Sequence, residues 1–255
     1  MGPLRLSLIV AGLATLVPAV ELLRGAAWAT ELWPWEATPL SYLFLASILA
    51  AIAMPVLWIG VTGELAAMRA GAVDLGLMYG GMLVYTLLRL GDRGQPALGA
   101  YAAVFAVGVV AMALTLVLTR RTPWRDERRM PRPLRAAFAA LAAILVAAGA
   151  ALVAGADIFP WKLGAETSVM FGLIYLGAAA YFACGVLEPR WPNAAGQLVG
   201  FLAYDLILIG PFVDRFGEVS GGQLTSLVVY TTVVVASALL AVYYLFVAEA
   251  TRLSA

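Results

Sequence analysis

The sequence of 255 residues contains no histidine, and this absence excludes several kinds of functional site. Histidine is the commonest protein ligand of metal ions and a usual axial ligand of haem. It is also the side chain that normally titrates near neutral pH. A haem or chlorophyll bound through histidine is therefore excluded, and we predict neither a metal site nor a cofactor. Apolar packing alone can hold a lipid, a quinone or a carotenoid, so these ligands stay open.

Charged residues and cysteine are scarce as well. Only 12% of the chain is charged, whereas a soluble domain carries about 25%. The net charge of +1 provides no field that would attract nucleic acid, so we predict no nucleic-acid partner. The single cysteine, Cys184, cannot form an internal disulfide and is expected to act as a small buried apolar residue.

Apolar residues dominate instead. Hydrophobic types make up 63% of the chain, and the mean hydropathy is +0.93. A helix that crosses the bilayer needs about 20 mainly apolar residues. Eight segments meet this requirement: 4–24, 40–62, 73–91, 97–119, 134–156, 166–188, 194–213 and 223–247. The sequence therefore predicts an all-α membrane protein with eight transmembrane helices. The first segment could also be a signal peptide, because Ala27-Trp28-Ala29 resembles a cleavage site, but we favour a span.

The connection between the fourth and fifth segments is rich in arginine. It contains seven arginines: Arg120, Arg121, Arg125, Arg128, Arg129, Arg132 and Arg135. Positively charged loops stay in the cytoplasm, so we predict that this loop and both termini are cytoplasmic. Arginine greatly outnumbers lysine beside abundant alanine and glycine, which indicates a GC-rich bacterial genome and hence the bacterial inner membrane. The alternative role of the arginine run is to bind anionic lipid headgroups.

A short pattern occurs twice in the chain. The sequence ELWPW spans residues 31–35, and DIFPW spans residues 157–161, at a separation of 126 residues. A second pair follows, in which GMLVYTLL begins at Gly81 and GFLAYDLI begins at Gly200. Matches in the same order along both halves indicate an internal duplication.

The duplication predicts a division of the chain into two halves. Residues 1–119 would form one four-helix repeat and residues 134–255 the other, with residues 120–133 as the arginine-rich linker. Four spans return the chain to the same side of the membrane. Both copies would therefore have the same orientation and be related by an axis along the membrane normal.

The repeated turns contain proline and aromatic residues, which are Trp33, Pro34, Trp35, Phe159, Pro160 and Trp161. Tryptophan favours the lipid headgroup level, so we predict an outer belt that anchors the following helices. A paired gate or a docking patch for another subunit stays open. The first turn, with Thr38, Pro39 and Leu40, resembles uncharacterised bacterial multi-pass membrane proteins that carry an aromatic-Pro-Trp-x-x-Thr-Pro-Leu turn. This resemblance covers about a dozen residues and implies no activity.

One acidic residue lies near the middle of a predicted span. Asp205 would cost about 2.5–3.5 kcal/mol at the bilayer centre, so it should face protein or water. Gln197 and Tyr204 can share its helix face, and Tyr85 and Thr86 are candidate donors from the matching helix. Asp205 is either a cation or proton site or a structural hydrogen-bonding residue. Asp74, at the expected start of its helix, is interpreted as an acid that favours the helix N-terminus.

The sequence contains none of the common catalytic motifs. There is no histidine-containing triad, no phosphate-binding loop and no dinucleotide-binding turn. A lipid enzyme that uses Glu31, Glu36, Asp157 and Glu166 is the least favoured alternative. We favour a non-catalytic accessory or scaffold subunit of a larger membrane assembly, with membrane lipids and other membrane subunits as partners. The main alternative is a transporter of small solutes or ions that uses Asp205.

Overall fold

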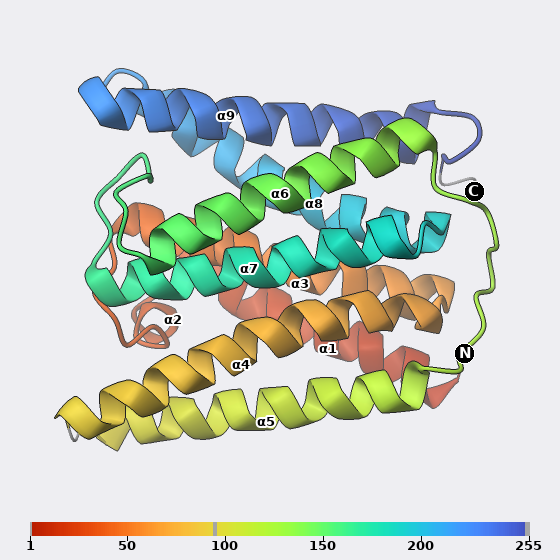
Figure 1. The fold of residues 1–255 in the computed structure, drawn as a ribbon, viewed down its shortest axis with the longest axis horizontal. Helices are drawn as coiled ribbons and strands as arrows, with labels where there is room; N and C mark the ends of the chain where they lie inside the picture. Colours follow the sequence, from red (N-terminus) through yellow and green to blue (C-terminus); the bar gives the residue numbers. More distant parts are fainter. Residues whose placement is uncertain (1, 94–95, 253–255) are drawn as a thin grey trace. The chain divides into compact units, whose positions relative to one another are not determined.

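The computed structural model describes residues 2–93 and 96–252, which are almost entirely helical (Figure 1). Eight helices are long and apolar enough to cross a membrane. They are α1 (Pro3–Leu23), α3 (Pro39–Thr62), α4 (Met68–Arg93), α5 (Pro96–Thr119), α6 (Arg132–Val153), α7 (Ala165–Leu187), α8 (Trp191–Arg215) and α9 (Gly221–Val242). The predicted class, an all-α protein with eight transmembrane helices, is confirmed.

The structure differs from the predicted spans in two places. A short helix, α2 (Ala27–Thr30), lies in the first connection, where no helix was predicted. The helical region of α4 begins earlier than the predicted residue 73, because a 3₁₀ turn (Leu65–Ala67) leads directly into the helix. Asp74 therefore lies beyond the first turn of α4, and its interpretation as an acid at the helix N-terminus is wrong.

Local sequence explains where α3 begins and ends. The hydroxyl of Thr38 accepts a hydrogen bond from the backbone N–H of Ser41, and Pro39 occupies the first helical position. These two residue types are favoured at those positions. Gly63 ends the helix with φ of 78°, and its N–H bonds the carbonyl of Ile59. The Thr-Pro part of the first aromatic turn is therefore a helix start signal.

The described chain forms two compact units. Unit 1 comprises Met1–Gly63, Asp157–Gly164 and Ala194–Ala255. Within it, α1 packs along α3, and α8 meets α3 at Gly200. A Cβ atom at Gly200 would lie 2.6 Å from the carbonyl oxygen of Ala51. That carbonyl lacks its usual helical partner, because Pro55 has no N–H. The glycine thus allows α8 to pack directly against this freed carbonyl.

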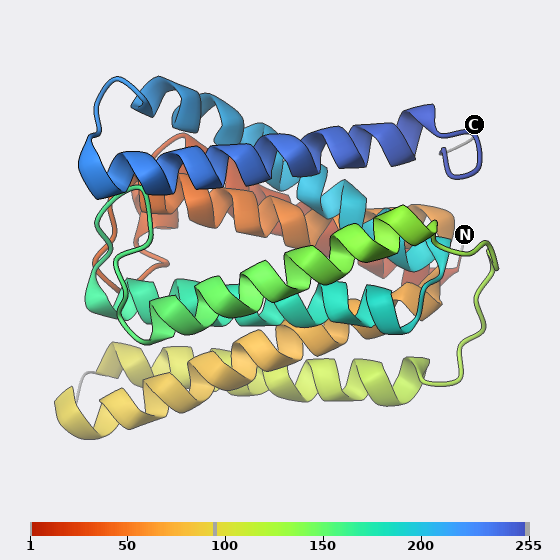
Figure 2. The same ribbon diagram turned by 45° about the horizontal axis from the view of Figure 1, so that its top comes forward.

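Unit 2 comprises Glu64–Ala156 and Ala165–Asn193. In it, α6 packs along α7 and α4 packs along α5, as both ribbon views show (Figure 2). α4 also packs against α7. The phenyl rings of Phe138 and Phe182 join α6 to α7 with centroids 4.9 Å apart. Each of these helix pairs lies within one unit and needs no part of the other.

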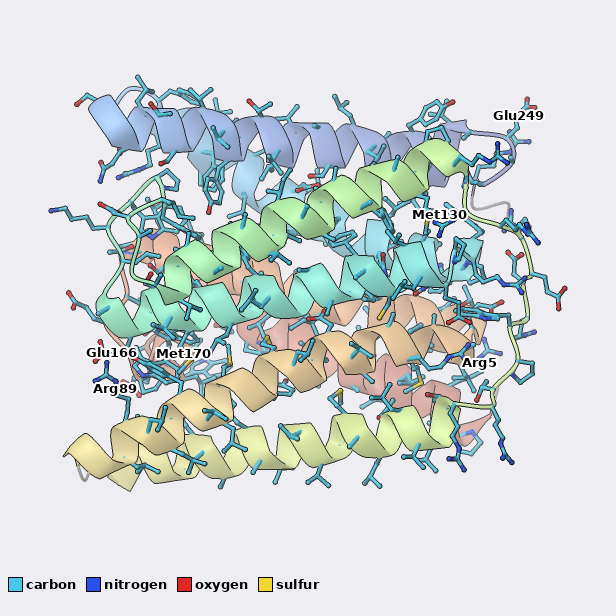
Figure 3. All side chains as sticks on the ribbon, viewed as in Figure 1. Arg5, Arg89, Met130, Glu166, Met170 and Glu249 are labelled. Atoms are coloured by element: carbon cyan, nitrogen blue, oxygen red, sulfur yellow. The ribbon has the colours of Figure 1, made fainter. Side chains whose placement is uncertain are left out.

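The predicted duplication stays a prediction, and two details within the units agree with it. In unit 1, Arg5 Nε donates to the carbonyl of Gly60 at 2.9 Å; Arg5 lies at the start of α1 (Figure 3). In unit 2, Arg135 Nε donates to the carbonyl of Val186, also at 2.9 Å. Gly60 and Val186 are 126 residues apart, the same separation as the two Pro-Trp turns. An arginine thus caps the end of α3 and the end of α7 at matching acceptors, although Arg5 and Arg135 themselves are 130 residues apart.

The composition of the units is the second detail. Unit 1 combines α1 and α3 from the first half of the chain with α8 and α9 from the second. Unit 2 combines α6 and α7 with α4 and α5. The compact units therefore do not follow the sequence division at residues 119 and 134. Under the predicted duplication, each unit would still contain one copy of every helix of the repeat.

Candidate functional site

Asp205 lies inside unit 1 and is completely buried. Its Oδ2 atom accepts a hydrogen bond of 2.8 Å from the hydroxyl of Ser237 on α9. Its Oδ1 atom has no hydrogen-bond partner within the described part of the chain. The carboxyl group therefore faces protein, as the cost of exposing it to hydrocarbon requires. The donor itself was missed, because Ser237 lies on another helix and carries no signal in the sequence.

The residues predicted to surround Asp205 come from two helices, α8 and α4. Gln197 is buried in α8, and the ring of Tyr204 lies against Phe44, with centroids 6.0 Å apart. Tyr85 and Thr86 belong to α4 in unit 2. The hydroxyl of Tyr85 accepts a bond from Arg89 Nε at 3.3 Å. A contribution of Tyr85 and Thr86 to the Asp205 site stays a prediction.

The second aromatic turn corrects the prediction of an outer belt. Phe159 and Trp161 are only 2% exposed each, so they cannot anchor unit 1 to lipid headgroups. Trp161 Nε1 donates a hydrogen bond to Ser41 Oγ at 3.1 Å, and the carbonyl of Pro160 accepts one from Arg215 Nε. A tryptophan after a proline suits both a headgroup anchor and a buried core. The sequence pattern alone therefore does not distinguish them.

The first turn differs from the second. Trp33 and Trp35 are half-buried, and their rings meet edge to face with centroids 4.8 Å apart. Pro34 is exposed. The belt prediction therefore stays open for these two tryptophans.

All seven arginines of the predicted linker are exposed. Arg128 forms an ion pair with Asp126, with nitrogen and oxygen 2.6 Å apart. Partial burial favours a higher pKa for Asp126, but the hydrogen bonds and charge of Arg128 outweigh it and lower this pKa. An exposed basic segment beside the ends of α5 and α6 suits the membrane surface.

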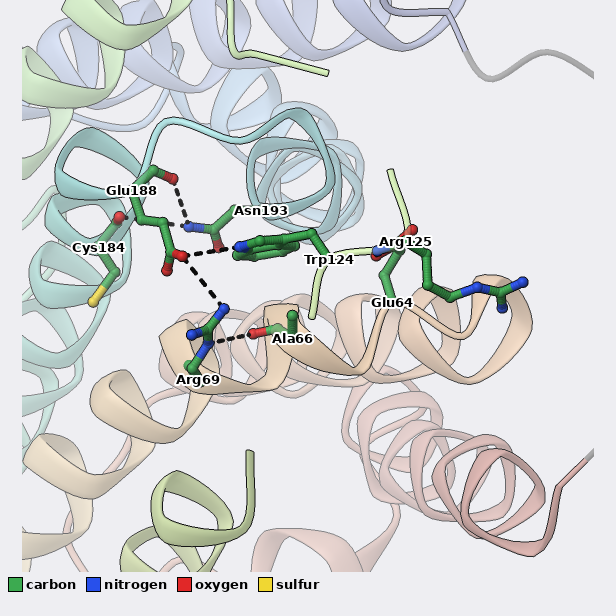
Figure 4. A network of polar contacts seen from close by, with 8 residues as sticks. All are labelled: Glu64, Ala66, Arg69, Trp124, Arg125, Cys184, Glu188 and Asn193. Carbon is green, nitrogen blue, oxygen red and sulfur yellow. Dashed lines mark hydrogen bonds and ion pairs between the residues drawn. The ribbon is translucent and has the colours of Figure 1, made fainter. Parts of the chain in front are cut away.

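A network of polar contacts that was not predicted joins the linker to the helices of unit 2 (Figure 4). Glu188, near the end of α7, is its centre. Its Oε1 atom accepts a bond from Trp124 Nε1 at 2.9 Å and lies 3.3 Å from Arg69 Nη2. The guanidinium of Arg69 also stacks on the indole of Trp124, 5.1 Å from the ring centroid. Three segments far apart in the chain thus meet at one carboxylate.

Glu64 provides a second attachment of the linker. Its Oε2 atom accepts a hydrogen bond of 3.1 Å from the backbone N–H of Arg125, and the residue is only 6% exposed. Burial raises the pKa of Glu64, although backbone hydrogen bonds from Arg125 and Asp126 act in the opposite direction. The carboxyl group therefore attaches the linker through a backbone hydrogen bond.

Beside this network lies a hollow of about 150 Å³. Its apolar wall contains Ala66, Ala70, Val73 and Leu187. Its polar wall contains Arg69, Trp124, Glu188 and Asn193, with Cys184 between the two. The hollow lies at one end of unit 2. Figure 3 shows Met130 and Arg89 at opposite ends of this unit, and the hollow lies at the end that contains Met130.

Asn193 is the most enclosed polar residue of the hollow, at 2% exposure. Its Nδ2 atom lies 3.4 Å from the carbonyl of Glu188 and 3.5 Å from that of Cys184. Its Oδ1 atom is buried without a hydrogen-bond partner among the described residues. A buried acceptor without a donor costs about 1–3 kcal/mol, so this oxygen is an unsatisfied group in the packed wall of the hollow.

Asp74 lies one turn deeper in α4 than the hollow residue Ala70. It faces Gly177 of α7, where a Cβ atom would lie only 2.7 Å from its Oδ1 atom. Tyr181 and Cys184 lie within electrostatic range of the same carboxyl group. Gly177 therefore makes room for the carboxyl group of Asp74 inside a membrane span. The sequence had instead suggested an ordinary acid at a helix end.

Comparisons of the chain with protein families, with curated proteins and with solved structures found no match. Within residues 2–93 and 96–252, no group of three acidic or cysteine side chains is placed to hold a metal ion. The described polar sites are therefore the buried Asp205–Ser237 pair and the half-open hollow with its polar network. The first holds a carboxyl group away from lipid, and the second places polar side chains around a hollow.

Proposed function

We propose that this protein is a non-catalytic accessory or scaffold subunit of a larger membrane assembly, and that it contacts a neighbouring transmembrane helix through α6. The carrying observation is the composition of the exposed face of α6. Ala136, Ala140, Ala143, Ala147 and Ala150 are all exposed. Their spacing alternates between four and three residues, so they form one continuous stripe along the helix.

The stripe lies on the side of α6 that does not pack within unit 2. The buried residues of α6 are Leu134, Phe138, Gly149 and Leu152, which lie on the opposite side of the helix at 100° per residue. Small residues on a transmembrane helix let another backbone approach closely, which is the usual way in which such helices associate. The stripe is therefore suited to a helix partner.

Two other helices of the same chain provide the comparison. The apolar segments of α1, α5 and α6 are all 17% buried. The exposed face of α5 nevertheless carries large residues such as Val104, Val107 and Leu114. That of α1 carries Leu6 and Val10. Large aliphatic side chains suit lipid tails, and α6 has exposed ones too, Ile144, Val146 and Val153, but they flank a stripe that is alanine throughout, and this stripe supports a protein contact.

A photo-activated cross-linking side chain placed at Ala143 tests this proposal in native membranes. We expect a discrete cross-linked protein band from Ala143 and only lipid adducts from the control site, Val107, which is 69% exposed on α5. Ala143→Leu should widen the helix contact and reduce recovery of the partner by at least about tenfold, because a few lost packing contacts amount to about 1.4 kcal/mol. Val107→Leu should leave recovery unchanged.

Two results would contradict the proposal. Equal labelling from both sites would mean that α6 faces lipid like α5. A single band at twice the mass of the chain would mean that α6 contacts a second copy, and the accessory role would fall.

One observation favours a second candidate, a transporter of small solutes or ions that uses Asp205. The Oδ1 atom of this buried carboxyl group lacks a partner in the described chain and is available to a cation or proton. We expect Asp205→Asn to fold normally in either case, because it preserves size and hydrogen bonding. Asp205→Leu should lower stability by about 1 kcal/mol, since it removes the hydrogen bond from Ser237, whose hydroxyl keeps the carbonyls of Val233 and Val234 as acceptors.

Thermal unfolding of the purified variants measures the structural effect, and growth or flux in the native membrane measures the function. A transporter would lose function in Asp205→Asn without losing stability, whereas a scaffold would keep both. Ser237→Ala is the matched control, because it removes the hydrogen bond and leaves the carboxyl group. If none of the three variants changes stability or function, Asp205 serves neither role.

The orientation is part of the same proposal. We propose that the protein resides in the bacterial inner membrane with the linker and both termini in the cytoplasm. The support is the exposed arginine cluster of the linker, since exposed positive charge is retained on the cytoplasmic side.

A further inference from the structure

The hollow in unit 2 carries one full charge of each sign. Arg69 provides the positive charge and Glu188 the negative one, and their side chains are partly exposed at 25% and 44%. A simple anion would be repelled by Glu188, and a simple cation would be repelled by Arg69. A ligand gains from both groups only if it carries both charges itself.

The other polar atoms narrow the chemistry. Asn193 Oδ1 is a buried acceptor without a described partner, and its side chain extends toward Glu188 and Trp124 (Figure 4). The partly exposed carboxylate of Glu188 is the acceptor that a donor group in the hollow can reach. A primary ammonium has three N–H donors, whereas a quaternary ammonium has none. Arg69 supplies donors for a phosphate, which guanidinium groups bind well.

The size and position of the hollow indicate the source. A cavity of about 150 Å³ holds a molecule the size of benzene, which is close to an ammonioethyl group with part of its phosphate. The hollow lies where α4 begins and α7 ends, at the boundary of two membrane spans. Leu187, at its rim, is 80% exposed and offers an apolar surface to an acyl chain.

We propose that this hollow binds a primary ammonium joined to a phosphate, as in the headgroup of phosphatidylethanolamine. The ammonium contacts Glu188, and the phosphate contacts Arg69. The same chemistry occurs in free phosphoethanolamine, which lacks the acyl chains that Leu187 and Val73 would contact. The proposal is independent of the alanine face of α6 and of any role of Asp205.

The test uses the full chain purified in a gentle detergent, with binding measured by native mass spectrometry and by thermal shift. The probes are short-chain phosphatidylethanolamine, phosphatidylcholine, phosphatidylglycerol and free phosphoethanolamine. We expect at least about tenfold tighter binding of phosphatidylethanolamine than of phosphatidylcholine, because a quaternary ammonium cannot donate the hydrogen bonds that Glu188 accepts. Free phosphoethanolamine should bind more weakly than the lipid; equal binding would support the site with a soluble ligand instead.

Variants locate the site. Arg69→Gln should weaken binding of phosphatidylethanolamine by about tenfold or more, and Asn193→Ala, which changes the wall of the hollow, should weaken it less. Arg121→Gln is the matched control, because Arg121 is an exposed arginine in the linker that contains Trp124 and does not line the hollow. Equal binding of all three lipids, a preference for phosphatidylglycerol, or an equal loss in Arg121→Gln would overturn the proposal. The comparison of lipids on the unmodified protein decides the matter even if Asn193→Ala fails to fold.

Discussion

Replacing Gly172 by leucine is expected to prevent unit 2 from folding, and replacing it by alanine to cost about 1–3 kcal/mol or more. A Cβ atom at Gly172 would lie 2.7 Å from the carbonyl oxygen of Gly149 and 2.9 Å from the backbone N of Val153. Both of these atoms belong to the backbone of α6 and cannot move aside as a flexible side chain can. The two helices would have to separate along the contact that joins them.

The reciprocal contact strengthens this expectation. A Cβ atom at Gly149 would lie 2.9 Å from the carbonyl oxygen of Gly172. Two glycines that face each other across a helix pair let the backbones approach closely enough for weak Cα–H···O contacts. Because Gly149 lies opposite the alanine stripe of α6, this contact also holds the stripe outward. Loss of the glycine pair should therefore reduce partner recovery as well as stability.

Thermal unfolding of the detergent-purified protein measures the effect. Gly80→Ala is the matched control, since Gly80 lies inside α4 of the same unit and a Cβ atom there would meet nothing within 4 Å. This control should be neutral or slightly stabilising, because alanine favours a helix more than glycine does. If Gly172→Ala unfolds at the same temperature as Gly80→Ala, the close approach of α6 and α7 does not contribute to stability.

The membrane spans could be predicted from the sequence because lipid imposes a simple requirement. A span must contain about 20 apolar residues, and the bilayer leaves few other ways to satisfy the backbone. The ends that differ are those without an apolar signal. The polar residues Glu64 and Arg69 flank the 3₁₀ turn that starts the α4 region, and they made this stretch read as a loop.

The sites were harder to predict, for a physical reason. The cost of burying a carboxylate predicts that Asp205 is inside, but it does not indicate which helix supplies the donor. Ser237 is 32 residues away, and the contact depends on how α8 and α9 are rotated about their axes. Glu188 likewise contacts Trp124 and Arg69, which lie 64 and 119 positions away from it in the sequence. Its signal in the sequence was a lone tryptophan within the arginine-rich linker.

The different burial of the two Pro-Trp turns could not be predicted from the sequence either, and it leads to the second large expected effect. Trp161→Ala is expected to destabilise unit 1 by about 3–5 kcal/mol, the usual cost of removing a buried aromatic ring. Trp161 is 2% exposed, and its ring lies 4.8 Å from Phe159, 6.1 Å from Phe212 and 6.4 Å from Phe44, between centroids. Removing it would leave a cavity among these rings. It would also take the donor from Ser41.

Trp35→Ala is the matched control, because Trp35 occupies the corresponding position of the first turn and is only half-buried. Its loss should cost about 1 kcal/mol. Trp161→Phe retains one aromatic ring but loses the hydrogen bond to Ser41 and part of the indole volume, so its cost should lie between those of the two alanine variants. Thermal unfolding of the three variants gives the order. If Trp35→Ala proves as damaging as Trp161→Ala, both turns perform the same structural task, and burial of the second ring is not what stabilises unit 1.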